Sequence, residues 1–131
     1  MAGALPDDPG VPNDEQLLRR IPPRHFFPDP NLGKLRPSTA AFEDDPDGSP
    51  MSVFLASRLI DVRDALVGHE GYALAAIPAG LARDCKQAIV PAPSPDAHPA
   101  ALAHALVVGK KPKSVRNRFA HESTWVVPPP A

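Results

Sequence analysis

The sequence has one cysteine, few aromatic residues and no long hydrophobic run. The single cysteine, Cys85, excludes an internal disulfide, and with no hydrophobic leader in view it predicts a reducing, cytoplasmic location. No apolar run approaches the roughly 18 residues of a transmembrane helix, which predicts no membrane association. The formal net charge of −1 argues against a protein that binds nucleic acid with its whole surface.

The motifs of common metal and catalytic sites are also missing. The histidines form no HxH, HExxH or HxxxH pair, so the sequence predicts neither a metal site nor a cofactor. The GxSxG turn of the α/β-hydrolases and the phosphate-binding pattern GxxxxGK[ST] are both absent. The sequence therefore contains no motif that would identify a hydrolase or a nucleotide-binding protein.

Proline, in contrast, fills 19 of the 131 positions. Each proline fixes φ and removes a backbone donor, so prolines mark where helices and central strands are interrupted. They predict a flexible acidic arm over residues 1–15, a single domain over residues 16–127 and a proline tail over residues 128–131. Seven prolines fall within residues 22–50, which we expect to be a long irregular segment around the core.

Between the prolines, the hydrophobic pattern predicts a small α+β domain with a short mixed or antiparallel sheet and about two helices. One helix is expected within residues 50–67, where Leu55, Leu59, Val62 and Leu66 form an apolar stripe with Leu59 in the core. A strand over residues 51–54 is the alternative for its beginning. The second helix is expected over residues 112–123, because Pro112 suits a helix start. Strands are expected over residues 16–21, 72–77, 87–90, 103–108 and 125–127, with a further short strand within residues 36–42.

Charge is distributed unevenly along the chain. Residues 1–105 hold 9 basic and 14 acidic residues, whereas residues 106–131 hold 5 and 1. Glycine and lysines join the strand expected at residues 103–108 to the basic helix, which favours anion binding. The alternative is a solvated helix face. The candidate anion- or partner-binding residues are Lys110, Lys111, Lys113 and Arg116.

An acidic protein surface is the preferred partner for this basic segment. RNA is the weaker choice, because the nearby aromatic residues, Phe119 and Trp125, are expected in the core rather than exposed for base stacking.

No group of residues specifies a reaction, but four side chains are candidates for catalysis. His104 begins an expected strand, where a side chain is well positioned to act as acid or base. His25 lies in the proline-rich segment beside Phe26 and Phe27. For both histidines we favour a structural role, as a hydrogen-bonded side chain and as a loop residue respectively. The other two candidates are Arg36 and Arg19.

The first expected strand carries Arg19 and Arg20, and the segments 36–39 and 49–52 supply an arginine and small hydroxyl side chains. Together with Glu122, the only late glutamate, they resemble the NAD-cleaving ADP-ribosyl folds over a small part of the chain. In those folds an early basic residue or histidine, a central hydroxyl motif and a late glutamate line the NAD cleft. The resemblance implies a small enzyme acting on an anionic nucleotide-type substrate. Its cleft would be lined by His104, Arg36, Arg19 and Lys110.

Two classes of function therefore remain. The favoured one is a small protein-interaction module, such as a subunit, adaptor, inhibitor or antitoxin-like partner, because size, missing motifs and polarised charge all fit it. The alternative is the small enzyme described above. An enzyme should bring histidine and arginine side chains together in a concave pocket. An interaction module should leave them apart and expose an apolar patch.

Overall fold

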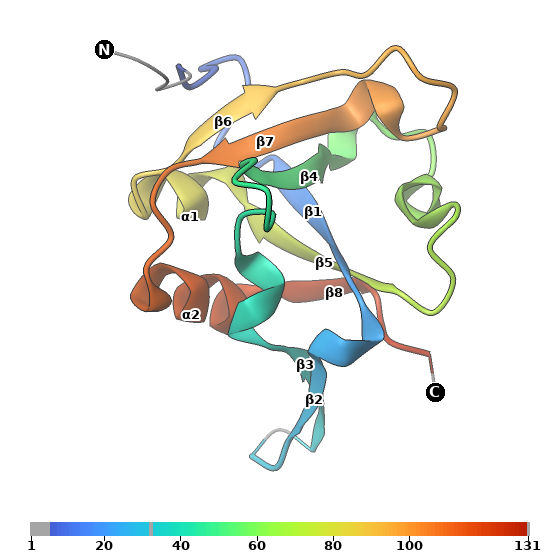
Figure 1. Cartoon of the computed structure of the whole chain (residues 1–131), viewed down its shortest axis with the longest axis vertical. Helices are drawn as coiled ribbons and strands as arrows, with labels where there is room; N and C mark the ends of the chain where they lie inside the picture. Colours follow the sequence, from blue (N-terminus) through green and yellow to red (C-terminus); the bar gives the residue numbers. More distant parts are fainter. Residues whose placement is uncertain (1–5, 32, 131) are drawn as a thin grey trace.

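The computed structural model describes residues 6–31 and 33–130 (Figure 1). The strands are β1 (Gln16–Ile21), β2 (Phe26–Asp29), β3 (Lys34–Pro37), β4 (Met51–Leu55), β5 (Ala73–Pro78), β6 (Ala88–Pro91), β7 (His104–Val108) and β8 (Thr124–Val127). The helices are α1 (Ala79–Asp84) and α2 (Lys113–Glu122). Short 3-10 segments are η1 (Pro23–His25), η2 (Thr39–Phe42), η3 (Ala56–Arg58), η4 (Val62–Leu66) and η5 (Ala101–Ala103).

The fold is α+β, as the sequence predicts. A six-stranded sheet has the order β6-β7-β4-β1-β5-β8, and β2 pairs with β3 in a separate hairpin. All of the strand pairs in the described residues are antiparallel. The main sheet is larger than the short sheet expected. Within residues 6–31 and 33–130, no helix is long and apolar enough to cross a membrane.

The helix predicted within residues 50–67 is wrong, and the alternative strand over residues 51–54 is confirmed as part of β4. Residues 51–55 form β4, which lies between β7 and β1, and the following residues form η3 and η4. Met51, Val53 and Leu55 are fully buried at alternate positions, so pairing on both sides of β4 overrides the helical spacing. Leu59 is only partly buried and is not the core residue expected.

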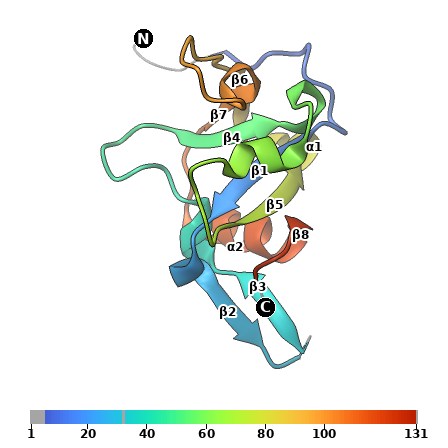
Figure 2. The same cartoon turned by 90° about the vertical axis from the view of Figure 1, so that its right-hand side faces the viewer.

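The other predicted elements are present, with ends that differ by one or two residues. Strands occur at each of the five expected ranges, and α2 matches the predicted basic helix. The segment 36–42 is extended only to Pro37 and then turns as η2. Residues 22–50 are more regular than expected, because β2 and β3 form a hairpin that projects from the main sheet (Figures 1 and 2).

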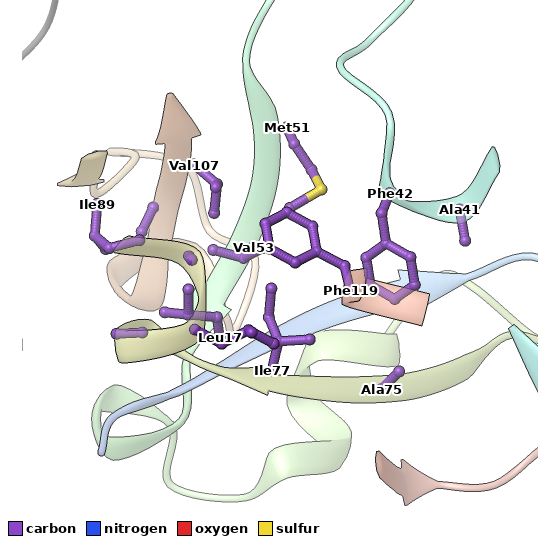
Figure 3. Packing of buried hydrophobic residues seen from close by; sticks show 14 of the residues in the cluster. Leu17, Ala41, Phe42, Met51, Val53, Ala75, Ile77, Ile89, Val107 and Phe119 are labelled. Carbon is purple, nitrogen blue, oxygen red and sulfur yellow. The ribbon is translucent and has the colours of Figure 1, made fainter. Parts of the chain in front are cut away.

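The two faces of the six-stranded sheet are covered by different elements. The larger core packs one face, with Leu17, Val53 and Ile77, against Phe42 and Phe119 (Figure 3). The second core covers the opposite face, where β1, β4 and β5 meet η4 and η5. Its buried residues are Leu18, Phe54, Ala65, Leu74, Ala76, Ala100, Ala103 and Val127. Because the elements over this second face are short, functional groups on it lie close to solvent.

The described part of the N-terminal segment, residues 6–15, packs against α1 and β6. Val11 is buried in the larger core, and the Asp7 carboxylate accepts a hydrogen bond from the Ile89 backbone N–H at 2.8 Å. Arg83 on α1 donates to Asn13 at 2.7 Å. The division of the chain at residues 15 and 127 stays a prediction, and residues 1–5 lie outside the described part.

Candidate functional site

The four residues of the expected enzyme cleft lie in different surroundings. His104 and Arg36 line two separate pockets, whereas Arg19 is bonded to backbone carbonyl groups. Lys110, the fourth residue of the expected cleft, is exposed in the loop before α2. The structure therefore does not gather His104, Arg36, Arg19 and Lys110 around one cleft.

His104 is held by both of its ring nitrogens. Nδ1 lies 2.8 Å from the Ala92 carbonyl oxygen and therefore donates to it. Nε2 lies 3.1 Å from the Ser52 hydroxyl on β4, and the ring packs edge-on against Phe54 at 6.0 Å. A histidine with both nitrogens occupied is typical of a structural residue, although one edge of the ring also faces a pocket.

Arg19 connects three segments through its guanidinium. Nε donates to the Ala41 carbonyl oxygen at 2.9 Å, and Nη1 donates to that of Ser52 at 2.8 Å. Nη2 lies 3.4 Å from the Glu43 carbonyl oxygen. Burial lowers the pKa of Arg19 below its usual value, but arginine remains charged at neutral pH. With its donors directed at the backbone, Arg19 ties β1 to β4 and to the end of η2.

Arg36 lies in the hairpin pocket, a cavity of about 560 Å³ between the β2–β3 hairpin and the junction of α2 with β8. Its Nη1 donates to His121 Nδ1 at 3.1 Å, and its Nε lies 3.4 Å from an Asp29 carboxylate oxygen. The guanidinium carbon is 4.8 Å from the centre of the Phe27 ring. The Arg36 head group is thus in contact with His121, Asp29 and Phe27, although its buried Nε forms no hydrogen bond among the described residues.

His25 lies at the base of the same hairpin, and its backbone oxygen accepts a hydrogen bond from Ser38. Its Nδ1 is buried and has no hydrogen-bond partner among the described residues. Desolvation, with a smaller contribution from Arg24, lowers the pKa of His25 below its usual value. The fold therefore favours neutral His25.

This pKa shift predicts that stability decreases below about pH 6.5, the usual pKa of a histidine. Between that value and the lower pKa of the folded state, the unfolded chain binds more protons, so the free energy of unfolding falls as the pH falls. His25→Gln should show a shallower loss between pH 7.5 and 5.5 in urea melts. The same pH dependence in His25→Gln and wild type would contradict this assignment.

The basic segment before and within α2 folds against the acidic turn near Glu43. The Lys111 ammonium lies 2.6 Å from an Asp44 carboxylate oxygen and 2.7 Å from the Val107 carbonyl oxygen. Arg116 Nη1 lies 2.8 Å from a Glu43 carboxylate oxygen. Two of the four predicted partner-binding cations are thus paired within the chain, because an acidic turn distant in sequence returns to them. Lys110 and Lys113 are exposed, and their binding of a partner stays a prediction.

A second pocket, the Arg20 pocket, has a volume of about 330 Å³ and opens on the other face of the sheet. It is lined by Arg20, Phe54, His69, Ser94, Asp96, His98, Ala101 and His104. Of these residues, the sequence identifies only His104 as a leading candidate. Adjacent strand residues point to opposite faces, so Arg20 lies across the sheet from Arg19. The alternation of side-chain direction along β1 is the sequence signal that could have assigned Arg19 and Arg20 to opposite faces of the sheet.

Two contacts position Arg20, and its terminal amino groups remain available as hydrogen-bond donors. Its Nε donates to the Ala65 carbonyl oxygen. Its guanidinium carbon lies 4.6 Å from the centre of the Phe54 ring, a cation–π distance. Neither terminal amino group forms a hydrogen bond with another residue in the described ranges. The head group is fixed while two of its nitrogens remain able to bind a ligand.

Most other polar side chains of the Arg20 pocket are occupied, and His69 is bonded through one ring nitrogen, with Nδ1 3.2 Å from the Val67 carbonyl oxygen. His98 Nδ1 accepts from the Ala100 backbone N–H at 3.1 Å, so its Nε2 donates to the Val67 carbonyl oxygen at 2.8 Å. The Asp96 carboxylate accepts from the His98 backbone N–H at 2.8 Å and lies 3.0 Å from the Ser94 hydroxyl. Arg20 is therefore the group with the most unused hydrogen-bonding capacity in this pocket.

No family model matches the chain, and comparison with curated proteins and with solved structures gives no significant match either. Among residues 6–31 and 33–130, no three His, Cys, Asp or Glu side chains come together in a group suited to a metal ion. The functional assignment therefore depends on the surface and pockets of the chain.

Proposed function

We propose that the chain is a protein-interaction module that binds its partner through the surface formed by η3, η4 and η5. Exposed aliphatic side chains carry this proposal. Ile60, Leu102 and Val67 are 103%, 71% and 49% exposed, and they are three of the four exposed large hydrophobic residues in the described chain. All three lie within or beside these 3-10 segments. We call Ile60, Val67, Leu102 and the Arg20 pocket the docking face.

Contacts between the segments support the grouping of these side chains. The segments η3 and η5 contact each other, and Leu102 follows Ala101, which lines the Arg20 pocket. The Val67 carbonyl oxygen accepts the His98 ring N–H, which joins the end of η4 to the loop before η5. Burying one large aliphatic side chain contributes about 1.5–3 kcal/mol. Grouped exposed side chains of this kind are typical of protein docking sites.

The enzyme alternative receives less support from the geometry. His104 and Arg36 line different pockets, and Arg19 is bonded to carbonyl groups. Glu122 lies exposed on α2, where its carboxylate pairs with Arg118 at 2.7 Å. The residues that resemble the NAD-cleaving folds therefore do not face one another across a single cleft.

Peptides selected from a random library on the immobilised protein should depend on the docking face. We expect the double variant Ile60→Asp/Leu102→Asp to bind the selected peptides at least about tenfold more weakly, because charges would replace apolar contacts. Leu35→Asp is the matched control, since Leu35 is an exposed aliphatic residue on the β2–β3 hairpin. Isothermal titration measures both affinities.

Two results would contradict this proposal. One is selected peptides that bind the double variant as tightly as the wild type. The other is sedimentation showing a wild-type dimer that the double variant abolishes, because the docking face would then be occupied by a second copy of the chain. The replaced side chains are exposed, so both variants are expected to fold.

A further inference from the structure

The Arg20 pocket lies within the docking face and presents an arginine that has no acidic partner in the described residues. We infer that this pocket binds the side-chain carboxylate of an aspartate or glutamate of the partner protein, an inference that rests on the proposed docking face. The ligand would enter beside the exposed aliphatic residues and meet the two terminal amino groups of Arg20.

The geometry suits a planar carboxylate. A guanidinium donates two parallel hydrogen bonds to one carboxylate, which gives both strength and orientation. Packing on the Phe54 ring and the bond from Nε to the Ala65 carbonyl oxygen hold the arginine before the ligand arrives. Less side-chain freedom is then lost on binding. Ala101 and Phe54 supply apolar walls that strengthen the charge interaction by reducing contact with water.

The charges around the pocket favour a carboxylate over a phosphate. Arg20 is the only arginine or lysine in the pocket lining, and it matches the single negative charge of a carboxylate. Asp96 lies in the same lining and would repel the additional charge of a phosphate dianion. Asp96 itself is no substitute for the ligand, because its carboxylate already accepts the His98 backbone N–H and faces the Ser94 hydroxyl.

A titration of the full chain with small ligands tests this inference without a known partner. The ligands are N-acetyl-glutamate N-methylamide, its glutamine analogue and inorganic phosphate, each followed by NMR at constant ionic strength. We expect the glutamate derivative to shift the Arg20 guanidinium signals and the Ala101 amide signal. Its affinity should exceed that of the neutral glutamine analogue by about tenfold or more, because a charged acceptor strengthens the hydrogen bonds.

Two variants separate charge from geometry. Arg20→Gln should remove the glutamate-specific shifts, and Arg20→Lys should restore only part of the affinity, because an ammonium lacks the planar fork. Arg63→Gln is the matched control, since Arg63 is an exposed arginine on η4 outside the pocket lining. If the Arg20 variants fail to fold, the affinities of wild type for the glutamate derivative and its glutamine analogue decide whether the pocket prefers a carboxylate.

The inference is overturned if wild type binds the glutamate and glutamine derivatives equally, or if phosphate binds more tightly than the glutamate derivative. Shifts that persist in folded Arg20→Gln would also overturn it. A failed titration accompanied by peptides that still require Ile60 and Leu102 would remove the carboxylate site and leave the proposed docking face intact. The reverse pattern would remove the docking face and retain an anion site.

Discussion

Phe119→Ala is expected to lower the free energy of unfolding by about 3–5 kcal/mol, the range for truncating a buried phenylalanine. Phe119 lies on α2 and is fully buried in the larger core (Figure 3). Its ring meets that of Phe42 edge-on, with centroids 6.1 Å apart. Because α2 contacts η2 at this position, the substitution removes ring contacts that join the basic helix to the segment following β3.

Urea unfolding at neutral pH measures this effect. Asn117→Ala is the control on the same helix, since Asn117 is exposed and its replacement should change stability by no more than about 0.5 kcal/mol. A loss below about 1 kcal/mol in Phe119→Ala would show that α2 is not held in the core through this ring. If Phe119→Ala loses about 3–5 kcal/mol of stability but binds the selected peptides as tightly as the wild type, the docking face does not depend on α2.

The sequence predicts α2 correctly because local signals agree there. Pro112 precedes the helix, and Val115 and Phe119, four residues apart, supply its buried side. Strands bounded by proline are also predicted well. The residues of β1 end before Pro22, and the run of β5 follows Gly71, so composition marks their ends without information from the rest of the chain.

The region of β4 shows where local pattern fails. Leu55, Leu59 and Val62 have helical spacing, but residues 51–55 pair with β1 and β7, which lie far away in the sequence. β4 is hydrogen-bonded to a strand on each side, and Met51, Val53 and Leu55, at every second position, are buried. Since these pairings depend on distant segments, neither the strand order nor the true core face could be read from this window.

The candidate site shows the same division between local and distant information. The basic composition around Lys111 is visible in the sequence, but its pairing with Asp44 depends on a turn more than sixty residues earlier. Likewise, Arg19 and Arg20 are neighbours with identical side chains, and only the strand pairing decides which one reaches a pocket. Arg20 lines a pocket on one face of the sheet, whereas Arg19 is enclosed by carbonyl groups on the other face.

Arg19→Met provides the sharpest test of this difference. We expect it to lower the free energy of unfolding by about 3–5 kcal/mol, because each hydrogen bond to a charged group contributes about 1.5–3 kcal/mol and part of this is offset by the desolvation of the guanidinium. The Ala41 and Ser52 carbonyl oxygens would lose their donors at 2.9 and 2.8 Å. Arg24→Met is the matched control, because Arg24 is an exposed arginine in η1.

Arg19→Lys distinguishes hydrogen-bond geometry from charge at this position. A lysine keeps the positive charge, but a single ammonium cannot reproduce donors directed at two carbonyl groups from different segments, so we expect most of the loss to remain. Differential scanning calorimetry and urea melts should agree on this order: wild type and Arg24→Met most stable, then Arg19→Lys, then Arg19→Met. If Arg19→Met instead unfolds within about 1 kcal/mol of wild type, the guanidinium does not hold β1 to β4 and η2. Arg19 would then return as a functional candidate on the face of the sheet opposite Arg20.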